Sequence, residues 1–233
     1  ARNDERTAAS GVWIVRPPST GRITPVTNDD SSDTRYTAAF AIVTTIIINV
    51  GAFTLAFFLV KTFRGRNLFR SVFFMPNLIG GIVLGYIWLL LLNGILGYWA
   101  RSITYDSTYG FWGMVVLLCW QQIGYMMIIY IAGLQAIPGE LYEAAEMDGA
   151  SGSKILGHVT LPLVMPSITV VTFLTITNGF KMFDQNLALT NGAPSRMSEM
   201  LALNIFNTFY GRTGFEGVGQ AKAVLFVIVV VAI

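Results

Sequence analysis

The stretch 143–166, EAAEMDGASGSKILGHVTLPLVMP, lies between two long apolar runs and decides how the chain is organised. Its first half is acidic and helix-forming, and Gly149 supplies a left-handed stop for that helix. Leu161 and Pro162 then lead into the next apolar run. A polar helix held between two candidate membrane spans offers a docking point to another protein, so we predict a membrane subunit that is driven from outside the bilayer.

Five long apolar runs make up most of the chain on either side of that stretch. Most are near the ~20 residues that cross a bilayer as a helix. None contains an Asp or Glu, and none shows the polar stripe of a soluble helix. Only 12% of the 233 residues are charged, against about 25% in a soluble domain. We therefore predict an all-α membrane protein, a polytopic helical bundle with five visible spans. The runs are 38–60, 71–92, 111–134, 163–180 and 218–233.

Other classes of protein find little support in the composition. The formal net charge of +2 gives no signal for nucleic-acid binding, and the single cysteine, Cys119, excludes an intrachain disulfide framework. The chain lacks a G-x-x-x-x-G-K-[ST] loop for nucleotide phosphates. His158 has no second histidine with which to bind a metal, and SGSK at 151–154 lacks the companion motifs of a serine nucleophile. We expect no enzyme, no metal and no cofactor in this chain.

The short loops predict the orientation. The loop 61–70, KTFRGRNLFR, carries four basic residues and no acid, which places it in the cytoplasm. Alternation then puts 135–162 inside and 181–217 outside. The polar segment 1–37 is predicted to be an exposed extracytoplasmic segment, and we expect a further span before Ala1. Pro162 and Pro166 are expected to flank a kinked entry to the fourth run.

The segment between the third and fourth runs has the features of a docking helix. Pro138 can open it, and Glu140 falls in its first turn, where the helix dipole favours an acid. Leu141, Ala144, Ala145 and Asp148 are three or four residues apart and share one face. The alternative is an ordinary acidic loop at the membrane surface.

This segment resembles the EAA signature of ABC-importer permeases, which is E-A-A-x-x-D-G-A, then a spacer, then an apolar residue and L-P-x-x-x-P. Further stretches are similar to the carbohydrate branch of that family: LFRSVFFMPNLIGGIVLGYIW (68–88), GLQAIPGELYEAA (133–145) and GVGQAKAVLF (217–226). FDQNLALTNGAP (183–194) resembles the maltose-type first permease. The resemblance covers roughly 35–233. The matching positions are Glu143, Ala144, Ala145, Asp148, Gly149, Ala150, Val159, Leu161, Pro162 and Pro166.

The resemblance implies a permease domain over 38–233 with an EAA loop at 136–166, in a family that has at least six spans. It implies an inner or plasma membrane of a bacterium or archaeon. Its partners would be a sister permease, two cytoplasmic ATPase subunits that bind ATP and Mg, an extracytoplasmic sugar-binding protein, and membrane lipid. The residues that would couple to the ATPase are Glu143, Ala144, Ala145, Asp148, Gly149 and Ala150.

Passage of a sugar needs amides and hydroxyls for hydrogen bonds and an aromatic face for the sugar ring. Adjacent glutamines in an apolar run are costly unless they face a cavity or another helix. For each residue alone, a hydrogen bond between helices is an equal alternative; for the group Gln121, Gln122 and Tyr125 together with Asn178, a substrate path is favoured. The candidates are Asn77, Gln121, Gln122, Tyr125, Thr175 and Asn178, with Trp120 as an aromatic face.

Three rival functions remain. An ion-coupled carrier commonly uses a carboxylate inside the membrane, whereas all thirteen acids lie outside the apolar runs. A scaffold without transport would not need the polar residues of the third and fourth runs. An ABC permease for another small solute also fits the signature.

Overall fold

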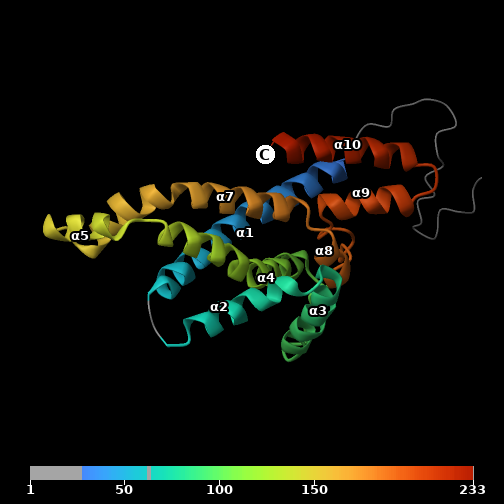
Figure 1. Ribbon diagram of the computed structural model, residues 1–233. Helices are drawn as coiled ribbons and strands as arrows, with labels where there is room; N and C mark the ends of the chain where they lie inside the picture. Colours follow the sequence, from blue (N-terminus) through green and yellow to red (C-terminus); the bar gives the residue numbers. More distant parts are fainter. Residues whose placement is uncertain (1–27, 62–63, 233) are drawn as a thin grey trace, which may run out of the picture.

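Three long helices form the core of the computed structural model, which describes residues 28–61 and 64–232 and has no β-strand among them. They are α1 (Asn28–Val60), α4 (Ser107–Gln135) and α7 (Leu161–Phe180). Helix α1 packs along both α4 and α7, and α4 also contacts α7 (Figure 1). The predicted all-α class is confirmed.

Small residues bring these three helices close together. A Cβ atom added at Gly179 of α7 would lie 3.0 Å from the Cα of Ala41 in α1. A Cβ atom at Gly133 of α4 would meet the hydroxyl of Ser167 in α7. Close approach lets dispersion forces act between helices in lipid, where no hydrophobic force drives them together.

Within residues 28–61 and 64–232, three helices are long and apolar enough to cross a membrane, Asp33–Val60, Ser107–Gln135 and Gly152–Phe180. They correspond to the first, third and fourth predicted runs. The last of them contains a π-helical turn, η2 (Leu156–Thr160), directly before α7. Pro166 lies inside α7, so the prediction that it flanks a kinked entry is wrong.

The second predicted run does not form one straight span. It includes the end of α2 (Arg66–Phe74), the 3₁₀ turn η1 (Met75–Leu78) and most of α3 (Gly81–Gly97). The helices before and after the break are bent by 100°, so the pair counts as a fourth span only if it is a broken one. Pro76 restricts the backbone in the 3₁₀ turn, which ends at an extended residue, Ile79.

Helix α2 packs against α4 at Gly124. A Cβ atom at this position would lie 1.7 Å from the carbonyl oxygen of Phe73, a backbone atom that no rotamer change can move. We expect Gly124→Ala to destabilise the protein by about 2–3 kcal/mol because α2 must move away from α4. The measurement is the thermal unfolding midpoint of the purified protein in detergent.

Gly94→Ala is the matched control, because no atom lies within 4 Å of its added Cβ and alanine favours the helix. The thermal unfolding midpoint of Gly94→Ala should be no lower than that of the wild type. Equal midpoints for the two variants would contradict the packing of α2 on α4.

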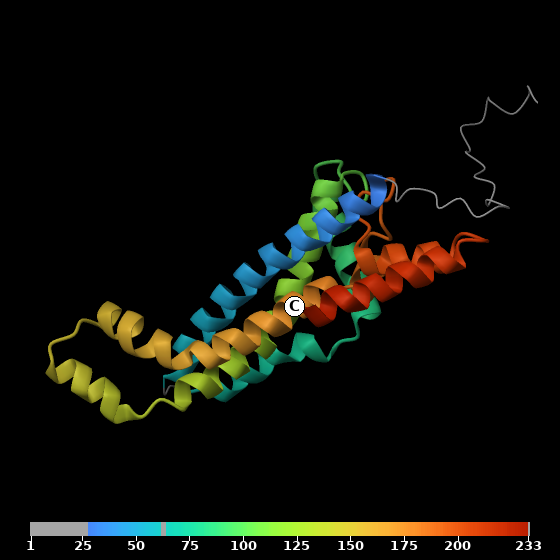
Figure 2. The ribbon, with the colours of Figure 1, turned by 90° about the horizontal axis from the view of Figure 1, so that it is seen from above.

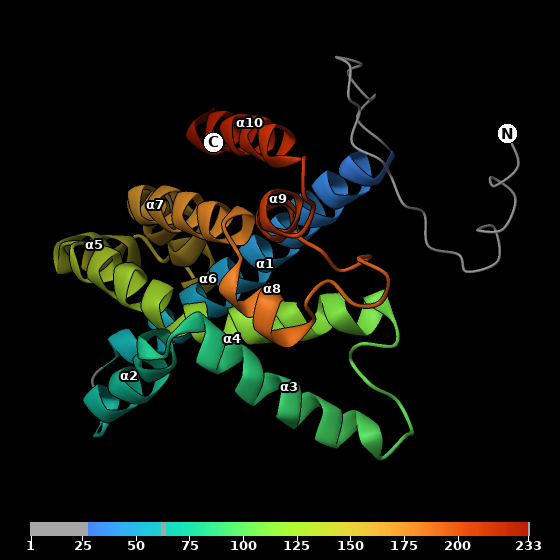
Figure 3. The same ribbon diagram turned by 90° about the vertical axis from the view of Figure 1, so that its right-hand side faces the viewer.

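The second half of the chain adds three shorter helices at the end of the core where α7 finishes. They are α8 (Asp184–Leu189), α9 (Leu201–Tyr210) and α10 (Glu216–Ala232). Helix α3 packs on α8, and α10 packs on α9 (Figure 3). Helix α10, the fifth predicted run, has 17 residues and is not among the candidate spans of the described chain.

Residues 28–37, which the sequence assigned to an exposed segment, are helical, and Asp33 and Thr37 among them are buried, so that part of the prediction is wrong. The Thr37 hydroxyl accepts a hydrogen bond from the backbone N–H of Leu201, at the start of α9. The buried Asp33 accepts one from the Asn204 side chain, 2.8 Å away. These hydrogen bonds compensate for the burial of the polar groups. The rest of the predicted segment, 1–27, lies outside the described residues.

Among the acids whose burial the structure describes, two are buried, although both lie outside the predicted apolar runs. Asp33 is one, and Glu199, with 1% of its surface exposed, is the other. Glu199 accepts a hydrogen bond from the Asn207 amide and lies 3.9 Å from the Arg196 guanidinium. In α10, the Lys222 ammonium donates to the Asn204 side chain. These polar groups connect α1, α9 and α10.

Candidate functional site

The segment between α4 and α7 projects from the core as a hairpin, residues 136–160. It contains α5 (Gly139–Met147) and the single turn α6 (Gly152–Ile155), followed by η2. Figures 1 and 2 show α5 at the end of the molecule, beyond the core helices and at the end where α1 finishes. The end of α1 leads into the basic loop, so the two segments predicted to be cytoplasmic lie on the same side.

Local sequence explains both ends of α5. Pro138 is the residue before its first turn, and Glu140 lies in that turn. At the other end, Gly149 has φ +73°, a conformation that glycine adopts without strain. The backbone N–H of Gly149 donates to the carbonyl oxygen of Glu146, and that of Ala150 donates to the carbonyl oxygen of Ala145, both over 3.0 Å. This pair of hydrogen bonds closes the helix as a glycine-terminated turn.

Helix α5 buries none of its residues. Its main contact with another element is with η2, where the Thr160 hydroxyl lies 3.5 Å from that of Tyr142. The Met147 side chain is 88% exposed, and Leu141 is also exposed. Since a helix is normally stabilised by packing its apolar side chains, a partner protein would supply contacts that the chain itself lacks.

The six predicted coupling residues all lie at the surface of this hairpin. Glu143, Ala144, Asp148 and Gly149 are exposed, and Ala145 and Ala150 are half-buried. Neither Glu143 nor Asp148 has an ion-pair partner within the described residues. The acids are therefore available to basic groups of another protein. His158 lies in the turn η2, where it is exposed.

Predicted path residues meet where α4, α7 and the chain around α8 come together. The Asn178 amide of α7 donates to the Gln122 carbonyl oxygen of α4 over 3.3 Å, and both side chains are half-buried. The neighbouring Gln121 is buried: it donates to the Ile79 carbonyl and accepts from Gln185 over 2.9 Å. Of the two glutamines, Gln122 is thus the more accessible.

The other predicted path residues do not join that pair. Thr175 is buried and donates to backbone carbonyls of its own helix, such as that of Val171 over 2.8 Å. The ring of Tyr125 packs near Phe74, 6.4 Å between centroids. Asn77 is half-buried in the 3₁₀ turn η1. Trp120, 44% exposed, packs edge to face with Trp88.

Sequence reasoning missed Asn49, which joins all three core helices. Its side-chain oxygen accepts from the Tyr130 hydroxyl over 2.6 Å and from the Thr172 hydroxyl over 3.3 Å. Its amide nitrogen lies 3.5 Å from the Thr175 hydroxyl. The available signal was an asparagine inside an apolar run, because a polar amide in hydrocarbon requires partners.

Among the described residues, no group of three or more His, Cys, Asp or Glu side chains could hold a metal ion. The chemistry that these sites offer is hydrogen bonding along the helices and protein contact at the hairpin.

Comparison with known proteins places these features in context. The profile of a family described as "Binding-protein-dependent transport system inner membrane component" matches residues 48–233. The chain is 40% identical over 210 residues to "Probable starch degradation products transport system permease protein AmyD" of Thermoanaerobacterium thermosulfurigenes, covering 85% of this chain and 70% of that one. It is 28% identical over 203 residues to the multiple sugar-binding transport system permease protein MsmF of Streptococcus mutans, covering 82% and 70%.

Among solved structures, a bacterial ABC transporter involved in the import of the acidic polysaccharide alginate superposes with a TM-score of 0.77. The match covers 89% of this chain and 77% of that chain, at 16% identity. At that identity the likeness shows a shared fold.

Proposed function

Because the chain belongs to the family of inner membrane components of binding-protein-dependent transport systems, we propose that it forms half of the translocation path of an ATP-driven sugar importer. The chain is a membrane transport subunit and not itself an enzyme. Its substrate would be a sugar or oligosaccharide, and the names of relatives that carry starch degradation products or multiple sugars support this class.

The observation that carries the proposal is helix α5, which projects from the core, buries none of its residues and ends in an exposed glycine turn. A cytoplasmic ATPase subunit would bind it, with basic groups facing Glu143 and Asp148 and an apolar surface against Met147. Movement of the two ATPase subunits on binding ATP and Mg would then be transmitted to α4 and α7, because the hairpin is continuous with both helices.

The partners follow from the same arrangement. A sister permease would supply the other half of the path, and two ATPase subunits would hydrolyse ATP. An extracytoplasmic binding protein would deliver the sugar. Within this chain, Gln122 and Asn178 are the proposed contacts of the sugar hydroxyls. Their amides are half-buried, and each could replace its hydrogen bond to the other with one to a sugar hydroxyl.

Labelling of single cysteines tests the docking and the orientation together. We expect Met147→Cys and Arg64→Cys to react with an impermeant thiol reagent only from the cytoplasmic side, because both positions are exposed at that end. Ser195→Cys, exposed at the other end, should react only from outside. The native Cys119 is buried and should stay silent.

Addition of the ATPase subunits should protect Met147→Cys from the reagent and leave Arg64→Cys reactive. Equal reactivity of Met147→Cys with and without the ATPase would refute docking at α5. Transport by the isolated chain, powered by an ion gradient without ATP, would overturn the proposed function as a whole.

A further inference from the structure

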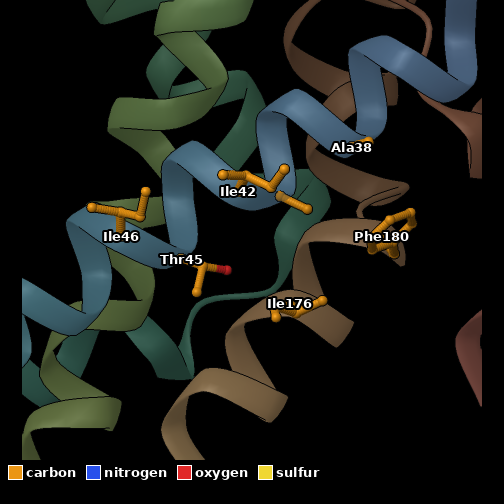
Figure 4. Close-up of a pocket in the computed structure, with 7 residues that line it drawn as sticks. Ala38, Ile42, Thr45, Ile46, Ile176 and Phe180 are labelled. Carbon is orange, nitrogen blue, oxygen red and sulfur yellow. The ribbon is translucent and has the colours of Figure 1, made fainter. Parts of the chain in front are cut away.

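Two hollows lie along one side of the seam between α1 and α7. The first has a volume of about 270 Å³, and Figure 4 shows side chains of both helices around it. The second, about 450 Å³, adjoins it through Thr45 and Ile46 and continues to Phe53. We call the two together the seam furrow. The first hollow is lined by Ala38, Ala41, Ile42, Thr45, Ile46, Ile176 and Phe180.

The first hollow is suited to hydrocarbon. All its lining side chains except Thr45 are apolar. From Ala38 to Ile46 it extends about 12 Å along α1, at 1.5 Å per residue, close to the ~15 Å depth of one leaflet of a bilayer. It begins near the end of the core opposite to α5, so it lies within the extracytoplasmic leaflet of the proposed orientation.

Two cations lie at the outer end of this hollow. Arg35 precedes Ala38 by about one turn of α1 and shares its stripe with Ala38 and Ile42, at spacings of three and four residues. Lys181 directly follows Phe180 at the end of α7. Both side chains are exposed. An apolar hollow with basic groups at its membrane-surface end has the charge pattern of a phospholipid site.

We propose that the seam furrow binds a membrane phospholipid with an anionic headgroup. One acyl chain occupies the first hollow, and the phosphate pairs with the Arg35 guanidinium, whose fork of N–H donors matches phosphate oxygens. The proposal requires a membrane around the chain and does not depend on the identity of the transported solute.

Native mass spectrometry of the assembled importer tests the proposal, with phosphatidylglycerol and phosphatidylcholine as probes. We expect the wild type to retain phosphatidylglycerol in preference to phosphatidylcholine. Arg35→Gln should reduce that preference about fivefold, the effect of one basic residue near a lipid surface. Ala38→Trp should abolish retention, because the indole fills the first hollow.

Matched controls change the same residue types at other surfaces. Arg212→Gln removes an exposed cation elsewhere on the same side of the membrane, and Val170→Trp adds an indole at an exposed position of α7 that does not line the furrow. Both should retain phosphatidylglycerol as the wild type does. If Arg212→Gln lowers the preference as far as Arg35→Gln, the effect is general surface charge and the proposal fails.

Three other results would also overturn it. If the Ala38→Trp variant still retains phosphatidylglycerol, the lipid binds elsewhere. If the same variant no longer assembles with the sister permease, the furrow is a protein interface. The Thr45→Val variant distinguishes an apolar occupant of the furrow from a polar one, because the Thr45 hydroxyl is buried in the wall of the furrow without a hydrogen-bond partner. Lipid retention unchanged or higher in Thr45→Val supports the proposal, whereas a loss shows that the furrow holds a polar group.

Discussion

Replacement of Gly149 by proline is expected to reduce ATP-driven sugar uptake about a hundredfold while the protein still inserts into the membrane. Proline holds φ near −65°, whereas Gly149 has φ +73°, and proline removes the N–H that donates to Glu146. A misfit of this kind costs about 3 kcal/mol, which corresponds to about a hundredfold in an equilibrium constant. No atom lies within 4 Å of an added Cβ at this position, so the effect would come from backbone conformation rather than from a clash.

Gly152→Pro is the matched control, three residues further along the same hairpin. Gly152 is the first residue of α6, where proline is tolerated because the N–H has no helical partner, and its φ is not positive. Uptake into vesicles and binding of the ATPase subunits to the purified permease are the measurements. Loss of uptake in both variants, or in neither, would show that the glycine turn of α5 is not the coupling element.

The second large effect is expected at the pair Gln122 and Asn178. Truncation of either residue to alanine should lower the apparent affinity for sugar about tenfold, because each side chain would lose a hydrogen bond of about 1.5 kcal/mol to a sugar hydroxyl. The double variant should lose less than the product of the two single effects, since the residues also bond to each other over 3.3 Å.

The measurement for this pair is the concentration dependence of uptake, together with ATP hydrolysis in the absence of sugar, which should stay unchanged. Gln220→Ala, an exposed glutamine of α10, serves as the control and should transport normally. Full affinity for sugar in both single variants would show that the pair serves only as a hydrogen bond between helices, which is the alternative that the sequence left open.

Much of the candidate site was predictable because its signals are local. The acids at the start of α5 and Gly149 at its end act within one or two turns of helix, and the structure forms that helix at those residues. The pair Gln122 and Asn178 could be selected as polar residues in apolar runs, but their contact with each other depends on the packing of α7 against α4. Asn49 had the same local signal and became recognisable only through its partners on two other helices.

Errors in the fold came from interactions between distant segments. Residues 28–37 are polar enough to resemble an exposed tail, yet Asp33 and Thr37 are buried by α9, about 170 positions further along the chain. The run 71–92 is apolar over most of its length, but η1 and the extended residue after it turn α3 away from α2 by 100°. Hydropathy reports that a residue avoids water and does not report the direction of the chain.

By itself, the sequence determined that the chain is an all-helical membrane protein with a polar helix between two of its spans. These properties depend on the number of consecutive apolar residues and on turn chemistry at Pro138 and Gly149, both of which act along the chain. The tertiary structure alone decided which polar side chains face one another, that Gln121 is buried while Gln122 is accessible, and where α1 and α7 leave a furrow. Lipid and protein interior are equally apolar, so a membrane helix carries little in its own sequence to distinguish its buried face from its exposed one.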